Sequence, residues 1–253
     1  MKLRSMFWAV LFLWASISTA VAAVPVGKAV QAGTYDSLYA GVYDGGIQVG
    51  TVLQEKSLGL GTFHALDGEM VVVDGVVFQV KGTGDVIQPD PSITSPFLTL
   101  INFTTSEPVS IPAGKSFDDT QRFIDSIVPE KNIPLAIRID GEFEFMTTRS
   151  FPAQKKPYRV LPEVMKEQQE FDRKIVSGSM VGFRFPSYMK GINALGYHFH
   201  FISSDRTFGG HVLSFTTKSC TVQVEKINEV SLEFPISDPK FLKIDFTPEC
   251  EDK

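Results

Sequence analysis

The sequence predicts an α+β fold rich in β-structure, with two linked domains that are each built on a β-sheet, the second mainly antiparallel. Most apolar runs are short, rich in valine, isoleucine and phenylalanine, and bounded by turn residues, which is typical of strands. Helical patterns are fewer. The polar segment 161–171, either an exposed helix or a connection, separates the two parts. We therefore expect domains at residues 24–165 and 166–253.

In the first part, two Asp-Gly pairs mark expected turns between strands. Asp74-Gly75 is a strong two-residue hairpin signal, and Asp140-Gly141 predicts a second turn. Charged and apolar residues alternate strictly at 142–145, which predicts a strand with one packed face and one polar face. The strands expected here are 70–73, 76–80, 97–103, 135–139 and 142–145.

Two segments have helical features. Residues 37–40 are expected to open a short helix. Residues 116–128 carry apolar side chains at Phe117, Phe123 and Ile127, a spacing that suits an amphipathic helix. In the second part, the expected strands are 196–202, 210–215, 220–226 and 230–234, with a loop at 203–209.

The N-terminal segment 1–23 has the features of a secretory signal peptide. Lys2 and Arg4 form a positive region, residues 6–15 are apolar, and Ala20 and Ala22 supply the small residues that precede cleavage. No later stretch reaches the roughly 20 apolar residues of a spanning helix. We therefore expect an exported protein, periplasmic or extracellular, with no membrane association after cleavage.

The charge and the cysteines narrow the partners and the covalent structure. Without Lys2 and Arg4, 22 basic residues face 29 acidic ones, a net charge of −7. This charge argues against nucleic acid or an anionic membrane surface as a partner. In an exported protein, a disulfide between Cys220 and Cys250 is reasonable. The alternative is two free, buried thiols.

Three of the four histidines fall within fourteen residues, at His198, His200 and His211. Residues two apart on a strand point to the same face, and a hairpin returns His211 beside the first two. Three neutral imidazoles leave the charge on a divalent metal undiminished and leave coordination positions open, as in catalytic zinc sites. The pattern predicts a mononuclear metal centre, whereas a His-x-His pair alone is more often a pair of ordinary surface or core histidines.

Two further residues are candidates beside this centre. Glu69 precedes the valine-rich strand, from which a carboxylate can enter a pocket, although a solvated carboxylate is the commoner case. Arg149 lies before Phe151-Pro152, where an exposed or ion-paired arginine is the default. His64, near Glu69, is most simply a core or supporting histidine.

Four ordered motifs resemble the acetolactate decarboxylases. They lie at residues 38–45, 61–70, 149–158 and 196–215, within a similarity that extends from about 37 to 246. The resemblance implies two linked β-rich domains, a homodimer, and Zn²⁺ held by His198, His200 and His211. It also places Glu69 and Arg149 beside the metal.

The implied reaction converts (S)-2-acetolactate to (R)-acetoin and CO₂. The metal would act as a Lewis acid on the ketone and hydroxyl oxygens of this small-molecule substrate. Arg149 would orient the departing carboxylate, and Glu69 would hold the hydroxyl proton and later help to deliver a proton to one face.

One departure from the family, and two alternatives, stay open on the sequence. Family members usually have a further glutamate in a C-terminal helix, for which Glu249 and Glu251 are the available substitutes here. A cupin-like dioxygenase or isomerase also uses His-x-His on a strand, but usually with a nearby glutamate that residues 201–207 lack. The other alternative is a non-enzymatic metal-binding β-protein.

Overall fold

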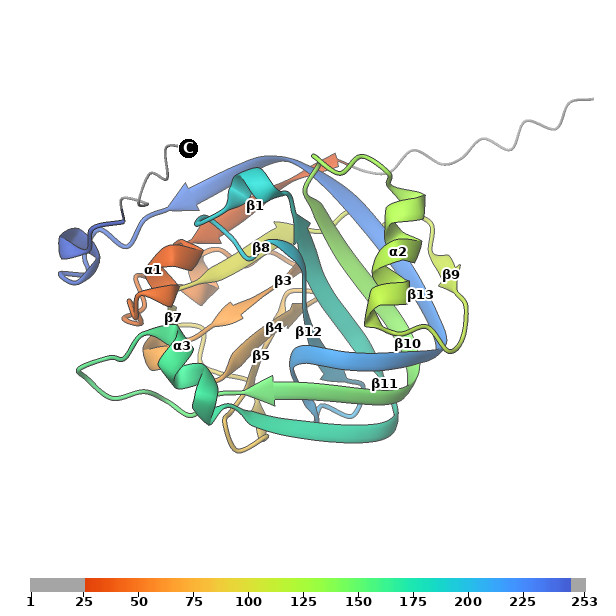
Figure 1. Ribbon diagram of the computed structural model, residues 1–253, viewed down its shortest axis with the longest axis horizontal. Coiled ribbons are helices and arrows are strands. Elements are labelled where there is room, and N and C mark those ends of the chain that lie inside the picture. Colours follow the sequence, from red (N-terminus) through yellow and green to blue (C-terminus); the bar gives the residue numbers. More distant parts are fainter. Residues whose placement is uncertain (1–25, 247–253) are drawn as a thin grey trace, which may run out of the picture.

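A computed structural model describes residues 26–246 of the chain (Figure 1). The expected signal peptide at 1–23 lies outside the described residues, as do Glu249, Cys250 and Glu251. The strands are β1 (Val26–Ala32), β2 (Ile47–Gln48), β3 (Ser57–Thr62), β4 (Glu69–Val73), β5 (Val76–Val80), β6 (Val86–Ile87), β7 (Thr94–Ser95), β8 (Leu98–Asn102), β9 (Val109–Ile111), β10 (Leu135–Ser150), β11 (Gln169–Phe185), β12 (Gly196–Ser203) and β13 (Gly209–Glu233). The α-helices are α1 (Tyr35–Tyr39), α2 (Phe117–Ile127) and α3 (Leu161–Val164). The 3₁₀ turns are η1 (Val49–Thr51), η2 (His64–Leu66), η3 (Met165–Glu167), η4 (Ser187–Met189) and η5 (Phe241–Lys243).

One large mixed sheet runs through both halves of the described chain. Its strand order is β10-β11-β12-β13-β1-β8-β3-β4-β5-β6, with β9 paired to β13, while β2 and β7 form a separate pair. The β1–β13 pairing is parallel and the other pairings are antiparallel. Because β10 also pairs with β13, the four strands β10 to β13 form a closed ring of pairings. The β-rich fold class is confirmed.

Strand β10 links the two parts expected from the sequence. It precedes the predicted boundary at residue 165, yet it pairs with β11 and β13, which follow that boundary. The division at 165 stays a prediction.

Several strands are longer than expected. Residues 135–139 and 142–145 belong to one continuous strand, β10, so the predicted turn at Asp140-Gly141 is wrong. Gly141 lies opposite both Gly178 of β11 and Cys220 of β13. A Cβ at Gly141 would lie 2.1 Å from the Ser219 carbonyl oxygen, so glycine here permits close strand contact rather than a turn. The three strands expected between 210 and 234 likewise form the single strand β13.

The two expected helices are present, and each begins at a capping box. Thr34 caps α1 with Ser37, and Ser116 caps α2 with Asp119. These side chains satisfy backbone N–H groups that the first helical turn leaves free. The polar segment 161–171 begins as α3 and η3 and ends as the start of β11. Its Leu161 and Val164 are buried, so this segment is not a purely exposed connection.

The core lies partly inside the ring of strands β10–β13. Aromatic rings pack edge-on there, with Phe143 5.5 Å from Phe201 and 5.7 Å from Phe215 between centroids. Helix α2 covers this cluster through the fully buried Ile124 (Figure 1). A second cluster joins β3, β4 and β5 to β11 and β12. Burial on both sides of β12 therefore leaves little freedom in its register.

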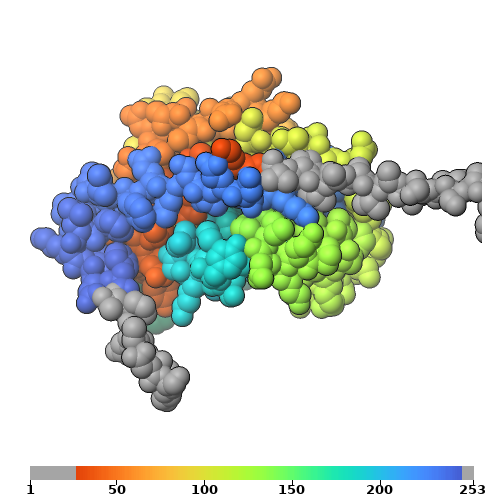
Figure 2. Space-filling view, turned by 90° about the horizontal axis from the view of Figure 1, so that it is seen from above, coloured from red at the N-terminus to blue at the C-terminus, as the bar shows by residue number. Residues whose placement is uncertain are grey.

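Three further features of the described chain concern its surface, its helices and its cysteine. In Figure 2, β13 and the segment after it form a continuous blue band across one face, beside the green helix α2. Within residues 26–246, none of the helices is long and apolar enough to cross a membrane. Cys220 is buried and has no disulfide partner within residues 26–246, and its thiol donates to the Glu142 carbonyl oxygen at 3.2 Å. Its expected partner, Cys250, is not among the described residues.

Candidate metal centre and active site

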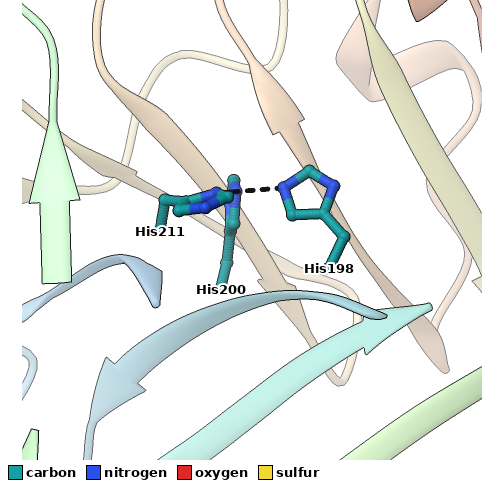
Figure 3. A group of neighbouring side chains, drawn as sticks. All are labelled: His198, His200 and His211. Carbon is teal, nitrogen blue, oxygen red and sulfur yellow. Dashed lines mark hydrogen bonds between the residues drawn. The ribbon is translucent and has the colours of Figure 1, made fainter. Parts of the chain in front are cut away.

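The three histidines expected as ligands converge on one point (Figure 3). His198 and His200 lie two residues apart on β12 and share one face, while Phe199 between them is buried in the core. His200 lies directly opposite His211 in the β12–β13 pairing. Strand alternation and this register bring the three imidazoles together, as the sequence predicts.

The facing ring nitrogens lie close to the spacing of a tetrahedral metal site. His198 Nε2 lies 3.0 Å from His211 Nδ1, which lies 3.3 Å from His200 Nε2. Tetrahedral zinc with Zn–N bonds of about 2.0–2.1 Å requires nitrogens roughly 3.3–3.4 Å apart. The three ligand atoms lie within 4.8 Å of one another. The donor set therefore fits a divalent ion after small side-chain adjustments.

The protonation states also suit metal binding. His200 Nδ1 donates to the Met70 carbonyl oxygen at 2.7 Å, so that Nε2 keeps its lone pair for a metal. Burial, reinforced by the nearby Arg149 charge, lowers the pKa of His198 to about 3. Burial also lowers the pKa values of His200 and His211 well below the ordinary value. At neutral pH all three imidazoles are neutral.

An ion pair lies against the histidines. Glu69 lies at the start of β4, and its Oε1 accepts a hydrogen bond from Arg149 Nη1 at 2.6 Å. Its other carboxylate oxygen, Oε2, lies 3.4 Å from His200 Nε2. Arg149 arrives from β10, where it is paired with His211, and its guanidinium lies 4.5 Å from the ring centre of Phe151. Burial raises the pKa of Glu69 to about 7, although Arg149 opposes this shift.

A strained turn precedes Glu69. Ala65 and Leu66 have φ angles of 61° and 54°, the left-handed region that side chains other than glycine rarely adopt. Hydrogen bonds from both sides hold the turn, because the Ala65 N–H donates to Tyr43 O at 2.8 Å and the Gln154 N–H donates to Ala65 O at 2.7 Å. The turn places Leu66 in the wall of the site.

These groups open into one cavity of about 160 Å³. The histidines, Glu69 and Arg149 form its polar part. Its apolar walls are Leu38, Leu66, Phe97, Phe151, Leu161 and Met165. A cavity with convergent polar groups and apolar walls can hold a small polar molecule and exclude bulk water.

The sequence prediction missed the other walls of the cavity. Tyr35 and Thr62 line it, as do the apolar side chains of Leu38 from α1 and Leu161 from α3. No local pattern marks them, because they come from elements far apart in the chain. His64 lies outside the cavity, half-exposed, and its Nδ1 accepts from the Gly45 N–H at 3.2 Å.

Comparison with known proteins identifies the family. The sequence profile of the family described as alpha-acetolactate decarboxylase matches residues 30–248. The chain belongs to the alpha-acetolactate decarboxylase family. This family is one of carbon–carbon lyases, so the resemblance found in the sequence and the expected enzyme class are both confirmed.

Individual alpha-acetolactate decarboxylases match over most of their length. The protein from Methylococcus capsulatus is 38% identical over 205 residues, which cover 81% of this chain and 79% of that protein. The one from Bacillus subtilis strain 168 is 36% identical over 211 residues, 83% of each chain. A crystal structure of alpha-acetolactate decarboxylase from that strain superposes with a TM-score of 0.83 at 33% identity, covering 88% of this chain and 94% of the other. Family membership favours the decarboxylase interpretation over the cupin-like and non-enzymatic alternatives.

Proposed function

We propose that this chain decarboxylates (S)-2-acetolactate to (R)-acetoin and CO₂, with Zn²⁺ held by His198, His200 and His211. The observation that carries the proposal is the meeting of three neutral imidazoles and the Glu69–Arg149 pair in one small cavity of an alpha-acetolactate decarboxylase. When bound, the ion supplies a Lewis acid for the ketone and hydroxyl oxygens of the substrate.

Zinc is among the metals that this donor set suits, and it is the one we propose. Imidazole nitrogens suit borderline ions, and three neutral ligands leave coordination positions for two substrate oxygens. The His200–Met70 hydrogen bond fixes one ring from behind, as supporting partners do in catalytic zinc sites.

Arg149 binds and orients the carboxylate that leaves as CO₂. Within the described residues its guanidinium is hydrogen-bonded to Glu69 through Nη1, which leaves the other N–H groups of the fork for the substrate. Its low exposure, with 12% of the side chain accessible, strengthens a charge-assisted hydrogen bond in the cavity.

Glu69 holds the proton of the tertiary hydroxyl and returns a proton to the carbon that CO₂ leaves. A carboxyl whose pKa lies at about 7 exchanges protons readily near neutral pH. The buried walls Leu66 and Phe97 keep bulk water from the reacting carbon. Because the Glu69 carboxyl group is fixed on one side of the reacting carbon, protonation by it gives a single product enantiomer.

We also propose that the protein is exported and acts as a homodimer. The signal-like segment 1–23 supports export, and the family resemblance supports the dimer. Cell fractionation with N-terminal sequencing of the mature protein tests the first, and light scattering at several concentrations tests the second.

The reaction is tested by incubating purified protein with racemic acetolactate and separating acetoin enantiomers by chiral chromatography. We expect (R)-acetoin from half of the substrate, loss of activity with a chelator, and recovery with zinc. A folded, zinc-replete sample that releases no acetoin would refute the assignment.

A further inference from the structure

Tyr35 lines the cavity, and the mechanism above does not use its hydroxyl group. It is the first residue of α1, directly after the cap residue Thr34, and its backbone N–H donates to the Ile192 carbonyl at 2.9 Å. Its ring packs edge-on against Phe97 with 6.5 Å between centroids. The capping box, this backbone bond and the ring contact together hold the side chain at the cavity wall.

The hydroxyl is available to a ligand. Elsewhere, Tyr158, Tyr188 and Tyr197 donate to Asp44, to the Asn132 carbonyl and to Asp125 respectively. The Tyr35 hydroxyl has no such partner within residues 26–246. A phenol that lines a polar cavity without a protein acceptor is placed to donate to a bound molecule.

Tyr35 and Arg149 line the same cavity, and the two side chains interact electrostatically. Burial raises the pKa of the Tyr35 phenol above its ordinary value, and the Arg149 charge opposes that rise. The hydroxyl therefore stays protonated at neutral pH and acts as a donor. A neutral donor beside a guanidinium favours an anionic acceptor, and the carboxylate is the anionic group of the proposed substrate.

We propose that the Tyr35 hydroxyl donates to the substrate carboxylate together with Arg149 and thereby selects hydroxy-oxo acids over uncharged hydroxy ketones. This inference rests on the proposed function. The hydrogen bond forms in the bound substrate and persists in the transition state, where the carboxylate still carries much of its charge, so it stabilises both states about equally. Tyr35 is thus a substrate-binding residue whose loss raises KM and leaves kcat unchanged.

Steady-state kinetics of Tyr35→Phe test this assignment. The substitution removes one oxygen and keeps the ring that packs on Phe97. We expect KM for acetolactate to rise about 10- to 100-fold, the size of a lost hydrogen bond to a charged group, at unchanged kcat. Tyr39→Phe is the matched control, because Tyr39 lies on the same helix but is 49% exposed and outside the cavity. Its kinetic constants should equal those of the wild type.

Calorimetric binding to zinc-loaded protein gives a readout independent of turnover. The probe 2-hydroxy-2-methylpropanoate keeps the carboxylate and the tertiary hydroxyl and lacks the 3-oxo group that reaction requires. Acetoin keeps the hydroxyl and the ketone and lacks the carboxylate. Tyr35→Phe should weaken the binding of 2-hydroxy-2-methylpropanoate about 10-fold or more and leave the binding of acetoin unchanged.

The outcomes separate this inference from the proposed function. Wild-type protein that forms no acetoin refutes the function. Wild-type protein that forms acetoin, with a Tyr35→Phe variant of unchanged KM and unchanged affinity for the acid, refutes the role of Tyr35 alone. A lower kcat at constant KM also overturns it, because the hydroxyl would then act in proton transfer rather than in carboxylate binding.

Discussion

Glu69 and Arg149 lie 80 residues apart in the sequence and form an ion pair, 2.6 Å between Oε1 and Nη1, that is almost closed to solvent. Removing charges from water is costly, and each member of such a pair offsets the cost of the other. The pair joins β4 to β10 across the cavity, so it bears on both stability and chemistry.

Replacing only Arg149 should destabilise the protein. At pH 8, above its pKa of about 7, Glu69 is ionised beside Arg149 in the wild type. In Arg149→Met the buried carboxyl has lost its partner and must either stay charged or take up a proton, and we expect a loss of about 3 kcal/mol in the free energy of unfolding. The double variant Glu69→Gln/Arg149→Met should recover part of this loss. Urea denaturation of the wild type, Glu69→Gln, Arg149→Met and the double variant measures the coupling, and additive effects would mean that the pair is not energetically coupled.

Conservative variants test the chemistry of the same pair. Glu69→Gln removes the ionisable proton carrier, and Arg149→Lys removes the planar fork, so we expect kcat to fall by about 100-fold or more in each. Zinc content is measured in parallel by atomic absorption to separate metal loss from lost catalysis. Normal turnover in both zinc-bound variants would show that the proposed roles are wrong.

Zinc should stabilise the folded chain through the three histidines. At about 100 times its Kd, zinc should add roughly 2.7 kcal/mol to the free energy of unfolding. His200→Gln should abolish this gain. His64→Gln is the control, because His64 lies outside the cavity. This variant should show the full stabilisation by zinc. Thermal unfolding with and without zinc measures this stabilisation. An equal stabilisation in the wild type, His200→Gln and His64→Gln would place the metal elsewhere.

The metal-free protein should lose stability in acid. The unfolded chain binds protons at histidine below pH 6.5, whereas burial holds the folded-state pKa of His198 at about 3. Stability therefore falls as the pH drops through this window, by up to about 1.4 kcal/mol per pH unit for each histidine. Glu69, with its raised pKa, acts in the opposite direction between pH 4.5 and about 7, but three histidines outweigh one glutamate.

Urea denaturation of chelator-treated protein between pH 4 and 8 measures this slope. His198→Gln should reduce the slope of stability against pH by the amount that corresponds to the binding of about one proton on unfolding. A stability that does not change with pH, or that rises in acid, would contradict the neutral, buried state of the histidines.

Relieving the strained turn should stabilise the protein. Ala65 has φ 61° and ψ 24°, which glycine adopts without steric cost, so Ala65→Gly should add about 0.5–1 kcal/mol. Ala40→Gly is the matched control, because Ala40 has φ −77° and gains nothing from glycine. Chemical denaturation measures the free energy of unfolding of both variants and of the wild type. An Ala65→Gly protein less stable than the wild type would show that the turn is unstrained.

Local patterns predicted the elements that short-range physics determines. Asp74-Gly75 forms the expected hairpin, and Ser116 caps the expected helix α2. The same Asp-Gly pair at Asp140-Gly141 is not a turn, because β11 and β13 pair with β10 on both sides and keep it extended. Long-range pairing of this kind leaves no signal in a window of a few residues.

The site divides in the same way. The histidine cluster was predictable, since strand alternation and one hairpin place all three ligands. The residue types of Glu69 and Arg149 alone indicated solvated or ion-paired side chains, and only the family resemblance placed them at the metal. Tyr35 and Leu66 could not be found from the sequence, because only the folded chain brings α1 and the turn before β4 to the same cavity.

The direct pairing of His200 with His211 makes the metal centre sensitive to strand registration. A slip of one residue between β12 and β13 would turn His211 to the opposite face and leave two ligands. We therefore expect tight zinc binding only in molecules in which β12 and β13 pair in the observed register. If zinc binds as proposed, titration with zinc would count the molecules whose β12–β13 hairpin has the correct register, and bound zinc would stabilise that register over a shifted one.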